Sequence, residues 1–124
     1  MPGKLVFGSA PERPLSPAVR AGDFVYVSGQ VPTGPDGLIV QGGLEAQVKQ
    51  VLENIRAALA LADATLDQVV KTTCVLDDAR DFAAFNKAYA AYFPKEPPAR
   101  TTIEARLMVD IKIEIDAIAY APQR

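Results

Sequence analysis

The sequence predicts a single α+β domain in which two α-helices pack on one face of a mixed β-sheet. Its 124 residues match the size of one domain, so we treat residues 1–124 as a single unit. Segments with the two-residue alternation of strands are interleaved with two segments of helical period, in the order strand, strand, helix, strand, helix, strand, strand. Each helical segment is apolar along one side, so both can cover the same face of the sheet.

The first third of the chain predicts short strands separated by a proline-rich loop. Residues 4–7 are a short β-prone run, whereas the prolines within residues 8–17 oppose regular structure. Residues 18–23 are expected to form a strand that ends in a Gly-Asp turn. Residues 24–32 are rich in β-branched and aromatic side chains and predict the strongest strand of this region, and residues 38–40 are expected to add a small strand.

Two helices are predicted, on either side of a strand at residues 69–76. The first spans residues 44–62, where apolar positions recur at helical spacing. The second spans residues 79–92, begins after a capping acidic pair at residues 77–78, and ends before Pro94. An aromatic stripe on the second helix is typical of core packing, and it consists of Phe82, Phe85, Tyr89, Tyr92 and Phe93.

Two strands near the C-terminus carry charged residues that favour a binding site. Residues 110–119 alternate between apolar and charged side chains, and residues 100–104 alternate as well. If the apolar sides of both strands face the core, we expect Arg100, Thr102 and Glu114 to share the opposite face. An arginine there can grip a carboxylate with two parallel hydrogen bonds, and a glutamate can position or deprotonate a water.

The same alternation is typical of a sheet with one solvated face, on which charged side chains have no binding role. The pattern alone therefore leaves both interpretations open. The uncovered face is also expected to carry Ile118 and Tyr120, and an apolar patch there favours self-association.

The chain contains one cysteine, Cys74, and no histidine. Serine–histidine and cysteine–histidine catalytic pairs are therefore excluded, as are zinc sites rich in cysteine or histidine within one chain. Proton transfer then falls to acidic residues, lysine, tyrosine, cysteine or water. Cys74 lies in a predicted strand and is expected to be a small buried side chain.

The charge balance and hydropathy predict neither a nucleic-acid partner nor a membrane partner. The net charge is −2, and no cluster of lysine and arginine is present. No apolar run approaches the roughly 20 residues that a membrane-spanning helix needs. The N-terminal residues lack the pattern of a signal peptide, so we expect a cytoplasmic protein.

Several motifs recur in one order along the chain. They are a proline-rich loop followed by Ala-Val, a strand ending in Ser-Gly-Gln, a Val-Lys-Thr-Thr strand, a Phe-Asn pair, a Pro-Ala-Arg-Thr-Thr segment and the last strand, at residues 14–19, 25–32, 70–73, 85–86, 98–102 and 111–119. Together they resemble the Rid family, the reactive intermediate or imine deaminases that are also called the YjgF family. The resemblance implies the chorismate-mutase-like Rid fold and a homotrimer with clefts between its subunits.

The resemblance also implies an activity and a set of site residues. The implied enzyme hydrolyses enamines or imines of 2-oxo acids, such as those derived from 2-aminoacrylate, to a 2-oxo acid and ammonia, without a metal ion or an organic cofactor. Arg100 would bind the carboxylate of the small-molecule substrate, and Glu114 would hold and activate the attacking water. The other implied substrate contacts are Ser28, Gly29, Thr102, Leu15 and Asn86.

Two other functions stay open from the sequence. One is a non-catalytic module that binds a 2-oxo acid in the same cleft. It stays open because the family commonly has a tyrosine where Leu15 stands and often a cysteine where Thr102 stands. The other is ribonuclease activity, which has been attached to some relatives. The acidic balance of the chain and its lack of histidine argue against the ribonuclease.

Overall fold

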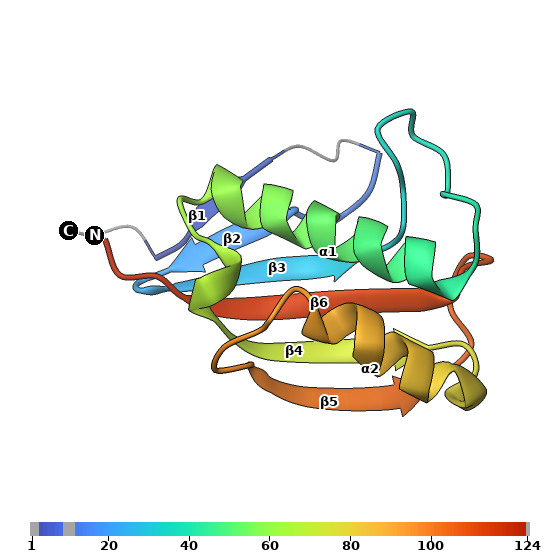
Figure 1. Cartoon of the computed structure of the whole chain (residues 1–124). Coiled ribbons are helices and arrows are strands. Elements are labelled where there is room, and N and C mark those ends of the chain that lie inside the picture. Colours follow the sequence, from blue (N-terminus) through green and yellow to red (C-terminus); the bar gives the residue numbers. More distant parts are fainter. Residues whose placement is uncertain (1–2, 9–11, 124) are drawn as a thin grey trace.

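Six β-strands form one mixed sheet, and two α-helices cover one of its faces (Figure 1). This computed structural model describes residues 3–8 and 12–123. The predicted α+β architecture with both helices on the same side is confirmed. In the described part of the chain, no helix covers the other face of the sheet.

The sheet contains one parallel pair of strands among antiparallel ones. Its strands are β1 (Leu5–Phe7), β2 (Ala18–Ala21), β3 (Phe24–Gln30), β4 (Val69–Leu76), β5 (Ala99–Glu104) and β6 (Ile113–Tyr120). They lie in the order β1-β2-β3-β6-β4-β5, and only β4 and β5 run parallel. A parallel pair needs a crossover connection, which helix α2 (Phe82–Ala90) provides. The edge strand β5 therefore lies under α2.

The first helix, α1 (Leu44–Leu61), closely follows its prediction, whereas the second is shorter than predicted. Residues Ala79–Asp81 form a 3-10 turn, and α2 begins only at Phe82. The side chain of Asp78 accepts a hydrogen bond from the backbone N–H of Arg80 at 2.9 Å, which fixes this tighter turn. A 3-10 turn at a helix N-terminus is common, because it uses the free backbone groups there.

Two strand predictions differ from the structure. Residues 38–40 form no strand but a loop with an isolated bridge between Thr33 and Ile39. Backbone hydrogen bonds close the loop locally, for example from Gly34 N–H to the carbonyl of Leu38, so few groups are left for a ladder. The last strand begins at Ile113 rather than at residue 110.

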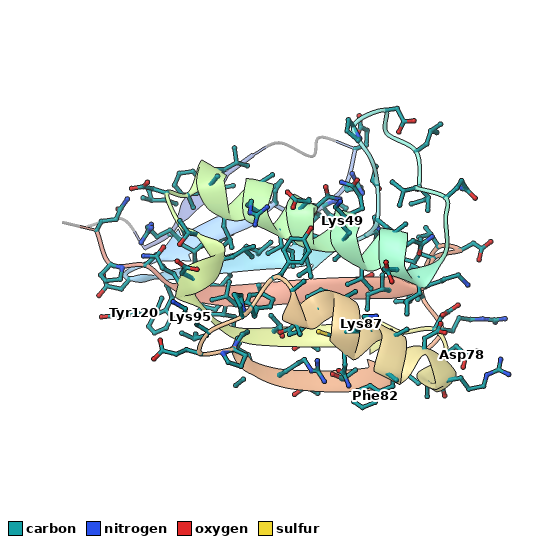
Figure 2. All side chains as sticks on the ribbon, viewed as in Figure 1. Lys49, Asp78, Phe82, Lys87, Lys95 and Tyr120 are labelled. Carbon is teal, nitrogen blue, oxygen red and sulfur yellow. The ribbon has the colours of Figure 1, made fainter. Side chains whose placement is uncertain are left out.

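The two faces of the sheet differ in what covers them. The helix-covered face holds the core, in which the alternate residues Ile113, Ile115, Ala117 and Ala119 of β6 are buried together with Cys74, as predicted for the cysteine. The uncovered face exposes large apolar side chains. Tyr120 is 46% exposed there, and its ring lies 5.3 Å from that of Phe24 (Figure 2).

A buried arginine joins three parts of the chain. Arg20 of β2 is only 3% exposed. Its guanidinium donates to the carbonyl of Ala62 at the end of α1 at 2.8 Å, and to that of Ala121 after β6 at 2.7 Å. Buried charges are rare unless they are well hydrogen-bonded. Arg20 therefore ties the C-terminal end of α1 to the sheet.

Candidate functional site

Arg100 lies on the helix-covered face of the sheet, whereas Glu114 lies on the uncovered face. Arg100 is opposite Thr72 in the β4–β5 register, and Thr72 is fully buried and hydrogen-bonded to α2. Glu114 alternates with the buried isoleucines of β6, so its side chain points away from the helices. The prediction that Arg100, Thr102 and Glu114 share one face is therefore wrong.

The physical reason for this error lies in β5. Its sequence has no clearly apolar side, and its residues are exposed or half-buried on both faces. The direction of its side chains is decided by the register with β4 and by the helix that crosses over it. Alternation within the strand could not show which side α2 covers.

Arg100 stacks on the aromatic stripe of α2. Its Cζ atom lies 5.7 Å from the ring centroid of Phe82, 5.1 Å from that of Phe85 and 5.0 Å from that of Tyr89. A guanidinium within about 6 Å of a ring face is attracted by the ring quadrupole. The two ion pairs of the described residues lie elsewhere. The donors at the edge of the guanidinium are therefore left for a carboxylate ligand.

A hydrogen bond to β4 fixes the aromatic stripe on which Arg100 stacks. The hydroxyl groups of Tyr89 and Thr72 are hydrogen-bonded at 2.8 Å, and burial raises the pKa of Tyr89. Burial also raises the pKa of the Cys74 thiol to about 11, so this cysteine is not a reactive thiolate. The aromatic residues were predicted to be core. They also form the surface on which Arg100 stacks, which we call the aromatic platform. A predicted helix that crosses over β5 could have indicated this second role.

Two buried polar atoms accompany Arg100. Thr102 shares the face of Arg100 in β5, and Asn86 lies one helical turn from Phe82 and Tyr89, two of the rings next to Arg100. The Oγ1 atom of Thr102 and the Oδ1 atom of Asn86 have no hydrogen-bond partner among the described residues. Buried polar atoms without partners are unusual and indicate a place where a ligand can bind. We call Arg100, Thr102 and Asn86 the Arg100 cluster.

Glu114 belongs to a second group of predicted residues. A Cβ atom added to Gly29 would lie 2.5 Å from the Oε2 atom of Glu114, so the carboxylate lies directly against this glycine. Burial, and then the negative charge of Asp116, raise the pKa of Glu114 above its ordinary value. A carboxyl group with a raised pKa is a better general base near neutral pH.

Gly29 and Leu15 both line a cavity of about 220 Å³. The other lining residues are Arg13, Pro17, Gln30, Val31, Thr33 and Asn54. Ser28 is next to Gly29, but its hydroxyl donates to the backbone carbonyl of Ser16 and is already used within the chain. We call Leu15, Ser28, Gly29 and Glu114 the Glu114 cluster. Arg13 was not singled out from the sequence.

The seven predicted residues thus form two clusters, with Arg100 and Thr102 on the helix-covered face of the sheet and Glu114 on the uncovered face. The described residues contain no group of three acidic or cysteine side chains that could hold a metal ion. Within the part of the chain that the structure describes, neither helix has the length and apolar character to cross a membrane. The chemistry available is a free guanidinium in one cluster and a carboxylate of raised pKa in the other.

A protein-family model described as Endoribonuclease L-PSP matches residues 7–121 of the chain. The chain belongs to this L-PSP family. The family resemblance seen in the motifs is confirmed, because a solved structure of the Rid protein YyfA from Yersinia pestis matches as well. That structure is 38% identical with a TM-score of 0.86, and the match covers 95% of this chain and 99% of that one.

Two further relatives are similar in sequence to most of the chain. A RutC family protein of Pyrococcus horikoshii is 47% identical over 112 residues, which is 89% of each chain. A protein of Saccharomyces cerevisiae named "Protein MMF1, mitochondrial" is 40% identical over 105 residues, 84% of this chain and 72% of that one. The cytoplasmic location expected from the sequence stays a prediction.

Proposed function

We propose that this protein is an imine deaminase that hydrolyses reactive imines of 2-oxo acids, at sites formed between the copies of a homotrimer. One observation carries the proposal. An unpaired guanidinium, Arg100, and a carboxylate of raised pKa, Glu114, lie on opposite faces of the same sheet. A site that uses both groups needs Arg100 from one copy and Glu114 from another.

The uncovered face supports such an assembly. It exposes apolar side chains on several strands, among them Tyr26 in β3, Ile103 in β5 and Tyr120 in β6. Large exposed apolar patches usually mark interaction surfaces. A ring of three copies repeats one asymmetric contact, so the same pair of clusters meets three times. Glu114 lies on this face, where a neighbouring copy would bring its own Arg100 cluster.

The proposed substrate is a 2-oxo acid imine, in which a carboxylate is attached to the carbon–nitrogen double bond. Arg100 grips the carboxylate through two parallel hydrogen bonds. The unpartnered Thr102 and Asn86 oxygens accept hydrogen bonds at the same end of the substrate, for example from an imine N–H. The aromatic platform limits the motion of the guanidinium, so the substrate is bound in one orientation.

The reaction then requires one water molecule and proton transfers. Glu114 takes a proton from the water as the water oxygen adds to the imine carbon, and it passes this proton to the imine nitrogen, which gives a carbinolamine. Glu114 then takes the hydroxyl proton as the carbon–oxygen double bond forms and the carbon–nitrogen bond breaks. This second proton goes to the departing nitrogen, so imine and water give 2-oxo acid and ammonia. No metal ion or organic cofactor takes part in this proposal.

The alternative is a module that binds a 2-oxo acid without turnover. It is favoured by Ser28, because its hydroxyl donates to Ser16 and is not free to donate to a substrate. Both functions need Arg100. Only catalysis needs Glu114, so the two residues separate the alternatives.

A coupled assay tests the proposal. An amino-acid oxidase makes the imine from one amino acid at a time, semicarbazide traps the imine that remains, and the semicarbazone is measured with and without the protein. The wild type should lower the signal, while Arg100→Ala and Glu114→Ala should not. Arg80→Ala and Glu45→Ala make the same charge changes at exposed sites and serve as controls. If the wild type hydrolyses none of the imines but still binds a 2-oxo acid, the deaminase proposal is overturned in favour of the binding module.

A further inference from the structure

The cavity beside Gly29 is lined by an arginine and by no acidic residue. Arg13 is the one charged residue among its eight lining residues, all of which the structure describes. Neither ion pair of the described residues involves Arg13. Arg13 therefore gives the lining a positive charge, while Glu114 touches Gly29 but is not one of the lining residues.

The side-chain amides of Asn54 and Gln30 in the cavity lining are hydrogen-bonded within the chain. Asn54 donates to the carbonyls of Val31 and Thr33 at 3.0 and 2.9 Å. The side-chain amide of Gln30 donates to the carbonyl of Ser28 at 3.1 Å. Leu15, Pro17 and Val31 supply apolar surface. Arg13 is thus the residue of this lining whose charge suits an anionic ligand group.

We propose that Arg13 is a second anion-binding group, and that the substrates are 2-imino acids whose side chain ends in a carboxylate. This inference rests on the proposed function. There, Arg100 of a second copy holds the carboxylate next to the imine, and the imine carbon lies at Glu114. The side chain of the substrate then extends along Gly29, which touches Glu114 and also lines the cavity.

The size and chemistry of the cavity fit such a side chain. A volume of 220 Å³ equals that of about seven water molecules at ~30 Å³ each, which is enough for two or three carbon atoms and a carboxylate. Leu15 and Pro17 can contact the methylene groups. The planar fork of Arg13 can bind the terminal carboxylate through two hydrogen bonds.

The test is the specificity of the assay described above. L-glutamate oxidase supplies the imine of a dicarboxylic acid, and an L-amino acid oxidase supplies that of alanine. The measured quantity is the ratio of kcat/KM for the glutamate imine to kcat/KM for the alanine imine. In Arg13→Gln this ratio should fall about fivefold, as for a partly exposed charge contact. Arg13→Lys should retain part of it, and Arg80→Gln should leave it unchanged.

Salt gives a second readout of the same contact. The ratio should fall in the wild type as sodium chloride is raised to 0.5 M, because salt screens exposed charges. It should fall less in Arg13→Gln, which has no charge to screen. The proposal would be overturned if the ratio is unchanged in Arg13→Gln, or if kcat/KM falls equally for both imines.

A binding measurement separates the failure of this inference from the failure of the proposed function. Calorimetry with 2-oxoglutarate and pyruvate measures both dissociation constants without turnover. Suppose that no imine is hydrolysed, but that Arg13→Gln raises the dissociation constant of 2-oxoglutarate about fivefold relative to that of pyruvate. The proposal of a second anion site is then supported and the deaminase proposal is overturned. If imines are hydrolysed and both 2-oxo acids bind Arg13→Gln as they bind the wild type, the deaminase stands and the anion site does not.

Discussion

Gly29 of β3 lies directly against the carboxylate of Glu114 in β6. An added Cβ atom would lie 2.5 Å from Oε2 and 3.1 Å from Cδ of the glutamate, which is closer than such contacts normally come. The missing side chain at Gly29 therefore lets the carboxylate approach the backbone of the neighbouring strand. This position half-buries Glu114, and burial is the main cause of its raised pKa.

Gly29→Ala should lower turnover sharply without unfolding the protein. The new methyl group pushes the end of a flexible side chain rather than backbone, so the carboxylate is displaced while the strands stay paired. A carboxylate displaced by about 1 Å from the water costs on the order of 100-fold in rate. The measurement is kcat in the semicarbazide assay, alongside thermal unfolding. Gly3→Ala is the matched control, because no atom lies within 4 Å of its added Cβ. Wild-type turnover by Gly29→Ala would contradict this role.

The acid limb of the pH–rate profile should follow Glu114. The base must be ionised, so kcat/KM should fall as the pH drops through its raised pKa. Asp116→Asn removes a negative charge that raises this pKa, so the limb should move to lower pH. The profile of kcat/KM is suitable, because it reports groups of the free enzyme. A limb that stays in place in Asp116→Asn would show that another group titrates.

The raised pKa of Glu114 also makes the stability of the protein depend on pH. Glu114 has a higher pKa in the folded state than in the unfolded state, so the folded state binds more protons between the two values. The free energy of unfolding should therefore fall as the pH rises from below the ordinary pKa through the raised one. Glu114→Gln should remove this part of the pH dependence. Urea unfolding at several pH values measures both, and an identical pH dependence in the variant would contradict the shift.

The aromatic platform should affect substrate binding through Arg100. Phe82 is at the exposed edge of the stripe, beside β5 (Figure 2). Phe82→Leu keeps an apolar side chain but removes one ring face from the guanidinium. At a partly exposed site this interaction is worth about 0.5–1 kcal/mol, so KM should rise about two- to fivefold. Phe82→Tyr retains the ring and should restore KM. Equal KM values in all three proteins would show that the platform does not position Arg100.

Local patterns in the sequence were sufficient to predict most of the fold. The isoleucines of β6 and the apolar stripe of α1 define the core-facing sides of these elements within their own segments. The Ser28-Gly29 step and the motif around Arg100 indicated residues that lie in the two clusters. Their division between two faces could not be predicted in this way, because it depends on the register of β5 with β4 and on the crossover of α2.

Arg20 is a further feature that the sequence did not indicate. Alternation places it on the covered side of β2, where a charged residue is not expected, and its partners are backbone carbonyls about 40 and 100 residues away in the chain. Contacts of this kind have no local sequence signal. They become visible only when the end of α1 and the end of β6 are placed together.

Arg20→Met should destabilise the protein while leaving its chemistry intact. The carbonyls of Ala62 and Ala121 would lose their donor in a buried place, and each loss costs about 1–3 kcal/mol. We expect the free energy of unfolding to fall by about 2–6 kcal/mol in urea titrations. Arg56→Met is the control, since that arginine is exposed and its pair with Glu53 contributes at most about 1 kcal/mol. Equal stability of the two variants would contradict the role of Arg20.

Sites shared between copies predict that two inactive variants can rescue each other. Arg100→Ala retains Glu114, and Glu114→Ala retains Arg100. In a mixed trimer, a site forms wherever Arg100 of one copy meets Glu114 of the next. Random mixing at equal amounts gives about one quarter of such contacts in a ring with one repeated interface. Co-refolding from urea should therefore recover about a quarter of the wild-type turnover, while each variant refolded alone stays inactive.

The double variant Arg100→Ala/Glu114→Ala provides the control for this rescue. Mixed with either single variant, it offers no contact that joins both groups, so turnover should remain absent. Sedimentation of each refolded mixture shows whether trimers have formed. Trimers without recovered turnover in the single-variant mixture would contradict a shared site. Since Arg100 and Glu114 lie on opposite faces of one sheet, the deaminase mechanism would then lose the contact between copies on which it depends.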